Sequence, residues 1–293
     1  MAERSRSTAH LLGYAEDARV LIINADDFGM CHAENVATMA GLEQGAFCCA
    51  TVMVPCPWFE EVATFAQRMP AADLGVHLTH TSEWQTYKWG PVCGASSVSS
   101  LVDTRGSFYA DVESVYAHAR LSEVERETRA QIDRALAAGI DVTHLDSHMG
   151  TLQLDVNYHE LYVRLAAEYR LPIRMTSRSS MHAMGMGEIL ALADRLGVFT
   201  PDYLWIGGPP QPEDTAAYWT ALFRNLKPGL NELYVRAAVD EPEMRAISDA
   251  WAQRAADYRF FSAPSTQALL RDLGIHVSGY RAVREQQRRT LSC

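Results

Sequence analysis

The stretch V-L-I-I-N-A-D-D-F-G, from Val20 to Gly29, decides how the fold of this chain is interpreted. Its apolar, β-branched run predicts a strand that is buried on both faces, as in parallel sheets. Two adjacent carboxylates, Asp26 and Asp27, follow at the point where the predicted strand ends. Aspartate favours turns and helix N-caps as well as active sites, so the pair alone leaves a structural and a chemical interpretation open.

Similar short runs recur along the chain and alternate with stretches of helical periodicity. Strands are expected at 20–24, 49–54, 74–79, 142–145, 173–176, 203–206 and 232–237. Helices are expected at 34–44, 59–69, 123–138, 158–170, 188–196, 215–226 and 243–258. Gly45 and Gly139 stand where helix ends favour glycine, and residues 122–125 have the pattern of a capping box.

Strands that alternate with helices pair in parallel through crossovers, and seven such units in about 250 residues favour a (β/α) barrel. An open α/β sheet stays possible on the pattern alone. No Pro, Gly or Ser-rich linker and no repeat divides the chain, so we expect a single domain over 18–293 after a flexible N-terminal extension over 1–17. The long irregular insertion at 81–108 carries Trp84, Tyr87, Trp89 and Phe108 and is typical of a functional lid.

Composition narrows the classes of partner. The formal net charge of -10 and the absence of a basic block argue against binding to nucleic acid or to an anionic membrane. The first residues have no apolar core for a secretion signal, and no later run reaches membrane-spanning length, so a cytoplasmic location is expected. The six cysteines lack C-x-x-C spacing and are interpreted as reduced structural thiols. Base rates for oligomers favour a homodimer.

Three motifs stand at the carboxyl ends of predicted strands, where parallel α/β folds assemble their sites. They are N-A-D-D-F-G at 24–29, G-V-H-L-T-H at 75–80 and T-H-L-D-S-H at 143–148. Each has a structural interpretation when taken alone, but their coincidence at one edge of the sheet favours a functional site. The side chains that they offer are Asp26, Asp27, His77, His80, His144, Asp146 and His148.

Two imidazoles and a carboxylate are a common set of ligands for a divalent cation with open coordination positions. A second carboxylate beside such a cation can deprotonate water. In an extended strand, residues 144, 146 and 148 point to one side, whereas Asp26 and Asp27 point to opposite sides. One aspartate could therefore bind metal while its neighbour acts as a base. His80 is interpreted as a loop residue near the site, and the run Gly-Gly-Pro-Pro at 207–210 as a turn.

The ordered motif set resembles the YdjC-like (ChbG/HpnK) carbohydrate deacetylase family. It consists of N-A-D-D-F-G, Asn35 in the next helix, G-V-H-L-T, H-L-D-S-H and the closing G-I-H-V-S-G-Y-R, and it extends from Val20 to Arg281. The resemblance implies a distorted, TIM-like (β/α) barrel. It also implies a metal-dependent hydrolase that removes an acetyl group from an N-acetylated amino sugar, such as an N-acetylglucosamine unit of a chitooligosaccharide.

The resemblance also implies roles for particular residues. Asp27, His77 and His148 match the metal ligands of the family, and Asp26 matches the base that activates metal-bound water. The implied cofactor is one divalent ion, either Mg, Zn or another transition metal. The other implied positions are His144, as a ligand or directly behind the ligands, and Arg174, which orients a carboxylate or the substrate. From their amphipathic rings, Trp84 and Trp89 are expected to stack on sugar.

Two departures from the family pattern concern the handling of protons and substrate. The family commonly has further histidines after the position of His148, whereas Met149 and Gly150 follow it here. Where the family often has E-L-M-C-H-P, this chain reads E-L-Y-V-R-A, so Arg236 replaces a histidine that could act as a general acid. Arginine stays protonated and cannot take that role, but it can bind an anionic group or stabilise an oxyanion.

These departures leave two other functions open. The chain could hydrolyse another small amide or an ester, or it could be a non-catalytic barrel that binds sugar. Like the deacetylase, both alternatives would bind a small molecule or an oligosaccharide.

Overall fold

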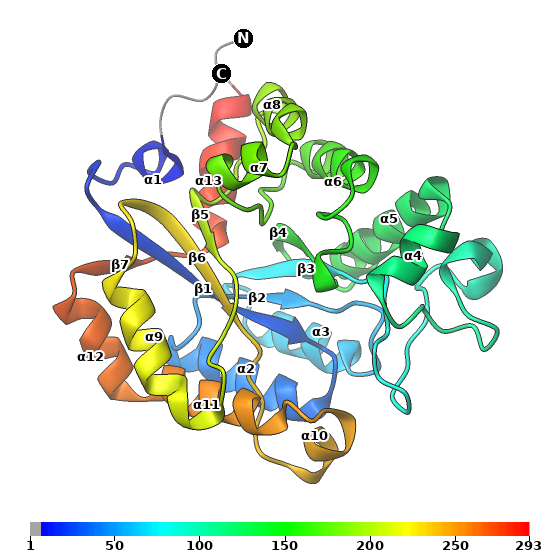
Figure 1. The fold of residues 1–293 in the computed structure, drawn as a ribbon, viewed down its shortest axis with the longest axis horizontal. Coiled ribbons are helices and arrows are strands. Elements are labelled where there is room, and N and C mark those ends of the chain that lie inside the picture. The colour runs from blue at the N-terminus through cyan, green and yellow to red at the C-terminus, as the bar shows by residue number, and fades with distance from the viewer. Residues whose placement is uncertain (1–6, 293) are drawn as a thin grey trace.

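A curled parallel sheet forms the centre of the computed structural model, which describes residues 7–292 (Figure 1). Within these residues the sheet has seven strands in the order β4-β3-β2-β1-β6-β5, and β7 also pairs with β1. The strands are β1 Arg19–Phe28, β2 Cys49–Val52, β3 Leu74–Leu78, β4 Val142–Ser147, β5 Tyr203–Trp205, β6 Gly229–Val235 and β7 Ile275–Val277. Every pairing is parallel, which confirms the α/β barrel class expected from the alternating pattern.

The sheet curls into a half-barrel rather than a closed ring. Residues 173–176 were expected to form a strand. They pair with β4 only at one isolated bridge, between Leu145 and Ile173. The Arg174 N–H donates to the Leu145 carbonyl, but the Ile173 N–H donates instead to Phe199, which lies outside the strands. This segment therefore makes no ladder with β5, and the expectation of a strand at 173–176 is wrong.

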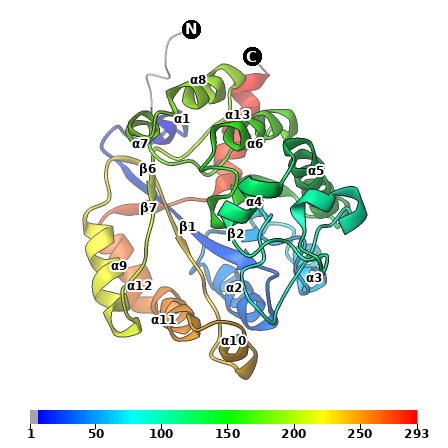
Figure 2. The same ribbon diagram turned by 45° about the vertical axis from the view of Figure 1, so that its right-hand side comes forward.

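Helices surround the outer side of the sheet in both views (Figures 1 and 2). The longer ones are α2 His32–Gln44, α3 Phe59–Arg68, α5 Leu121–Ala137, α6 Val156–Tyr169, α8 Gly187–Leu196, α9 Thr215–Arg224, α11 Trp251–Ser262, α12 Pro264–Asp272 and α13 Tyr280–Leu291. The shorter ones are α1 Thr8–Leu11, α4 Val112–His118, α7 Arg178–Ala183 and α10 Pro242–Ile247. Among the helices of residues 7–292, none combines the length and the apolar composition that crossing a bilayer requires.

Local signals predicted some helix boundaries and missed others. Gly45 ends α2 in the left-handed conformation, as expected. The capping box expected at 122–125 is wrong, because α5 begins at Leu121, so Ser122 lies inside the helix, and the Glu125 carboxylate accepts from Arg129 instead. The single helix expected at 243–258 is divided into α10 and α11 by an extended residue, Ser248.

Strand β1 lies at the middle of the sheet and joins two hydrophobic clusters. Val20 and Ile22 pack on one side with Ala9 of α1, and Leu21 and Ile23 pack on the other with the main core. Both faces are buried, as the apolar run predicted.

The N-terminal extension was expected to be flexible over 1–17, and its first six residues lie outside the described part of the chain. From α1 onward the extension is anchored to the domain. The Thr8 N–H donates to Asp202 at 2.8 Å, and the Thr8 hydroxyl donates to the Thr200 carbonyl at 2.7 Å.

Candidate active site

The end of β1 brings both aspartates to one histidine. Asp27 has a left-handed backbone with φ of 65°, and the register with β2 shifts between Ala25 and Phe28. Because of this bulge, Asp26 and Asp27 both place a carboxylate oxygen within 4.8 Å of a ring nitrogen of His77. The expectation that the two side chains point apart, as in a regular strand, is therefore wrong.

Asn35 of α2 holds the turn that follows the aspartates. Its side-chain oxygen accepts from the Gly29 N–H at 2.7 Å, and its amide donates to the Trp58 carbonyl and to Glu61. Gly29 has φ of 100°, a conformation that side chains with a Cβ rarely adopt. The conformation at Asp27 is thus fixed by contacts from α2 and from the start of α3.

Three donor atoms converge above β1, β3 and β4. His148 Nδ1 lies 3.2 Å from His77 Nε2, and Asp27 Oδ1 lies 3.4 Å from each of these nitrogens. All three side chains are buried, and Asp27 Oδ1 has no hydrogen-bond partner among the described residues. The structure therefore brings together the three residues that the sequence proposed as metal ligands.

The other nitrogen of each ring faces a carboxylate. His77 Nδ1 lies 2.7 Å from Asp146, and His148 Nε2 lies 3.1 Å from Glu83. Such pairing places the proton of each ring on the carboxylate side. The lone pairs of His77 Nε2 and His148 Nδ1 then face Asp27 Oδ1, and three electron-rich atoms within bonding distance of one point suit a divalent cation.

The electrostatics of this group also favour positive charge. Burial alone would raise the pKa of Asp27, but its interactions with His148, His77 and two arginines lower it well below the usual value. Burial would lower the pKa of His148, yet Glu83 and Asp27 raise it to about 10. The field of the surrounding carboxylates therefore stabilises a cation at this position.

A second charged group lies deeper in the half-barrel around Arg174. The guanidinium donates to both oxygens of Asp26, at 2.8 and 2.9 Å, and to Glu232 at 2.8 Å. It also donates to Asp146, whose carboxylate faces His77. Glu232 accepts from the Tyr280 hydroxyl as well. Asp26, His77 and Asp146 could form a further metal triad by proximity alone, but Arg174 already supplies positive charge to both of its carboxylates.

These contacts set the ionisation of two carboxylates. Burial would raise the pKa of Asp26, but Arg174 and His77 lower it below the usual value, so Asp26 is ionised at neutral pH. Burial raises the pKa of Glu232 to about 7, although Arg174 and Tyr280 oppose the shift.

His144 lies below the converging donors. Its ring stacks on Tyr280 with centroids 3.8 Å apart, and burial lowers its pKa well below the usual value. Gly75 leaves room for the ring, since a Cβ at that position would lie 2.5 Å from it. His144 is therefore held in place by packing between Tyr280 and Gly75.

Two cavities open onto this site. One of about 370 Å³ includes Glu83, His148 and Arg254 in its wall, and one of about 290 Å³ includes Asp26 and His77. Three residues belong to both walls: Met149, Tyr234 and Arg236. The donors thus lie where two parts of one cleft meet.

Arg236 follows β6 and stands at this junction. Its Nε lies 3.2 Å from Asp27 Oδ2, and its side chain is 40% exposed. Arg254 of α11 approaches the same oxygen at 3.1 Å. The two oxygens of Asp27 therefore have different neighbours: Oδ2 contacts the arginines, and Oδ1 faces the histidines.

The insertion at 81–108 covers one side of His148. Trp89 is only 4% exposed, its Nε1 donates to the Thr81 carbonyl, and its ring lies 6.4 Å from that of His148. Trp89 therefore supports His148 and offers no open face for stacking on sugar. Trp84 is partly buried against Trp89, with the Arg254 guanidinium 5.9 Å from its ring. His80 is buried in this region and bonds to Thr128.

Three contributions to the site were not expected from the sequence. Glu83 lies in the insertion without any motif around it, and Arg254 lies on a helix far along the chain from the three motifs. Residues 207–209, interpreted only as a turn, form part of the wall of the larger cavity. Only the expectation that the insertion acts as a lid could have drawn attention to Glu83.

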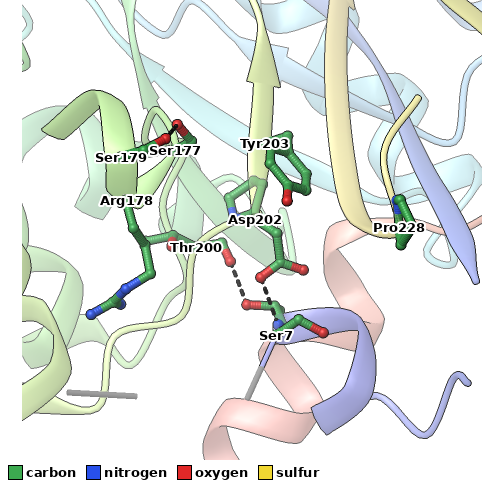
Figure 3. A pocket seen from close by; sticks show the side chains of 10 residues that line it. Ser7, Ser177, Arg178, Ser179, Thr200, Asp202, Tyr203 and Pro228 are labelled. Atoms are coloured by element: carbon green, nitrogen blue, oxygen red, sulfur yellow. Dashed lines mark hydrogen bonds between the residues drawn. The ribbon is translucent and has the colours of Figure 1, made fainter. Parts of the chain in front are cut away.

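A separate cavity of about 310 Å³ lies between α1, the start of α7 and the start of β5 (Figure 3). Its wall consists of Ser7, Thr8, Ser177, Arg178, Ser179, Thr200, Pro201, Asp202, Tyr203 and Pro228. Asp202 is engaged with the backbone of α1 and with the Leu230 N–H. This cavity shares no wall residue with the cleft and contains none of its donors.

Comparison with known proteins gives consistent results. A sequence profile described as YdjC-like protein matches residues 20–272. A carbohydrate deacetylase of Thermus thermophilus is 38% identical over 273 residues, which cover 91% of this chain and 94% of the relative. A carbohydrate deacetylase of Geobacillus stearothermophilus is 27% identical over 266 residues, which cover 90% and 97%.

The same fold occurs in a solved structure from Enterococcus faecalis V583, described as a cellobiose-phosphate cleavage protein. The TM-score is 0.77 at 24% identity, and the match covers 91% of this chain and 99% of the other. At this identity the likeness concerns the fold.

Proposed function

The chain belongs to the YdjC-like family, and on that premise we propose that it is a metal-dependent carbohydrate deacetylase acting on an N-acetylated amino sugar. The observation that carries the proposal is the convergence of Asp27 Oδ1, His77 Nε2 and His148 Nδ1, in which the buried carboxylate oxygen has no hydrogen-bond partner among the described residues. Two curated relatives that align with about nine-tenths of the chain are themselves carbohydrate deacetylases.

These three atoms would hold one divalent cation, either Mg, Zn or another transition metal. When bound, such an ion supplies Lewis-acid chemistry, polarising an acyl carbonyl and lowering the pKa of water. Asp146 and Glu83 orient the two imidazoles for this purpose.

Asp26 takes the role of the base. It is ionised, and it lines the smaller cavity beside His77. In hydrolysis the water oxygen bonds to the acyl carbon, Asp26 takes a proton from that water, and the C–N bond breaks. The departing amine needs a proton, and the one held by Asp26 is available in the same cavity.

Arg236 stabilises negative charge at the junction of the two cavities. Its guanidinium keeps its charge at working pH, because burial is outweighed by Asp27 and Asp26, which raise its pKa. It cannot replace histidine as a proton donor, so its contribution is to bind the oxyanion of the tetrahedral intermediate.

The test is acetate release from N-acetylglucosamine oligosaccharides by the wild type and by Asp26→Asn. We expect a loss of roughly 10²–10⁴-fold in kcat with metal content retained, because the amide cannot accept the proton. Asp240→Asn is the matched control, since Asp240 is exposed and pairs with Arg245 at the surface. Full activity in Asp26→Asn, or turnover unaffected by a chelator, would contradict the proposal. Acetate release from simple amides or esters but not from sugars would favour another hydrolase.

A further inference from the structure

Glu83 is the residue of the 81–108 insertion that reaches the candidate metal ligands. Both of its carboxylate oxygens lie close to His148 Nε2, at 3.1 and 3.2 Å. We propose that Glu83 is a positioning residue, which holds His148 so that Nδ1 faces Asp27 and thereby couples the insertion to metal affinity. The inference rests on the proposed function, because it concerns the same cation.

The two histidines present different nitrogens to Asp27. His77 uses Nε2 and turns Nδ1 to Asp146, whereas His148 uses Nδ1 and turns Nε2 to Glu83. In each case the carboxylate fixes which nitrogen carries the proton and how the ring is rotated. Glu83 therefore does for His148 what Asp146 does for His77.

His148 depends on such support more than His77 does. His77 lies within β3, where it pairs with Asp146 of β4 and directly follows Val76, which pairs with β2. His148 begins a 3₁₀ turn, His148–Gly150, in which Met149 and Gly150 have φ of 52° and 69°. A ring carried on this turn has no strand ladder beyond Ser147 to fix it.

The insertion holds Glu83 in place from both sides. The Ser82 N–H donates to the Tyr109 carbonyl at 2.7 Å, and the Trp89 N–H donates to the Ser82 hydroxyl at 3.2 Å. Trp84, which follows Glu83, packs against Trp89 with ring centroids 5.5 Å apart. Order in the insertion thus reaches His148 through the Glu83 carboxylate, in addition to the contact of the Trp89 ring.

Glu83 is not placed to be a further ligand beside Asp27. It contacts Nε2 of His148, and the two nitrogens of an imidazole point in different directions. Its side chain is 24% exposed and borders the larger cavity, so it closes the solvent side of the ring.

The experiment measures binding of Zn²⁺ to the metal-free, full-length chain by isothermal titration calorimetry, without sugar. We expect Glu83→Leu to raise the Kd by roughly 10–100-fold, since removal of a carboxylate behind a metal-binding histidine has this effect. Glu83→Gln should fall between Glu83→Leu and the wild type, because its amide oxygen still accepts from Nε2–H. Gln85→Leu, an exposed change in the same insertion, should match the wild type.

A second readout reports the coupling itself. Zn²⁺ should slow proteolysis within 81–108 in the wild type and in Gln85→Leu, and much less in Glu83→Leu. A Glu83→Leu affinity within twofold of the wild type would overturn the inference while leaving the proposed function intact. If Glu83→Leu does not fold, the same criterion applies to Glu83→Gln, which we expect to bind at least threefold more weakly than the wild type. A wild type that binds no Zn²⁺, Mg²⁺ or Co²⁺ would overturn both proposals.

Discussion

Two buried charged groups lie one above the other in the half-barrel, and they differ in how their charges are matched. The lower group consists of Arg174 with Asp26, Asp146, Glu232 and Tyr280, and the upper group of Asp27 with His77, His148 and Glu83. In the lower group one guanidinium contacts all three carboxylates. In the upper group two arginines reach only Oδ2 of Asp27, and Oδ1 faces two ring nitrogens without a hydrogen-bond partner among the described residues.

This difference separates a charge-matched network from a candidate cation site. Carboxylates and histidines are close together in both groups, so proximity of these residue types does not distinguish them. The oxygens that the arginines occupy do distinguish them. Arg174 binds both oxygens of Asp26, whereas the arginines beside Asp27 reach only Oδ2 and leave Oδ1 to the ring nitrogens. A buried carboxylate whose oxygens are already paired with arginine gains little from a second cation. We therefore expect substitutions of Arg174 and Tyr280 to change stability, and substitutions of the three donors to change metal binding. Asp26, which Arg174 holds in place, is the member of the lower group that the proposed turnover requires.

The largest expected effect in the lower group comes from Arg174→Met. Loss of the guanidinium leaves three buried carboxylates without their common counter-charge, so the free energy of unfolding should fall by about 3–5 kcal/mol. Urea denaturation of the metal-free chain measures it. Arg164→Met, which removes an exposed pair with Glu160, should change it by less than about 1 kcal/mol. Equal effects of the two substitutions would remove the distinction between the buried group and a surface pair.

A smaller effect is expected from Tyr280→Phe, which removes only the hydroxyl that donates to Glu232. A typical hydrogen bond contributes about 0.5–1.5 kcal/mol and one to a charged group about 1.5–3 kcal/mol. Because burial raises the pKa of Glu232 to about 7, we expect the free energy of unfolding, measured by urea denaturation, to fall by about 1–3 kcal/mol. The Kd for Zn²⁺ should stay within twofold of the wild type. A tenfold higher Kd would show that the lower group also determines metal affinity.

The sequence was informative wherever local pattern determines structure. The apolar run at 20–24 predicted a doubly buried strand. The three motifs at strand ends predicted that their polar side chains would meet, because carboxyl ends of parallel strands share one edge. The family resemblance then singled out Asp27, His77 and His148 among them. The left-handed conformation of Asp27 was not predictable, since it depends on contacts that Asn35 makes from α2. It reverses the expected divergence of the two aspartates.

Contributions from distant segments could not be predicted. Arg254 comes from α11 and Glu83 from an irregular insertion, and neither position carries a periodic or motif signal. The burial of Trp89 behind His148 depends on how the insertion folds back on itself. The expectation that Trp89 stacks on sugar was based only on its amphipathic ring and did not anticipate that the ring is buried.

The central claim is that the upper group binds a divalent cation, and the most direct test is the bound metal. Elemental analysis of the chain, purified without an affinity tag or chelator, should find about one equivalent of a divalent ion in the wild type and a large loss in His148→Ala. Tyr280→Phe, which alters only the lower group, should keep the wild-type content. No metal in the wild type after incubation with Mg, Zn, Co and Ni, or full retention in His148→Ala, would contradict the account.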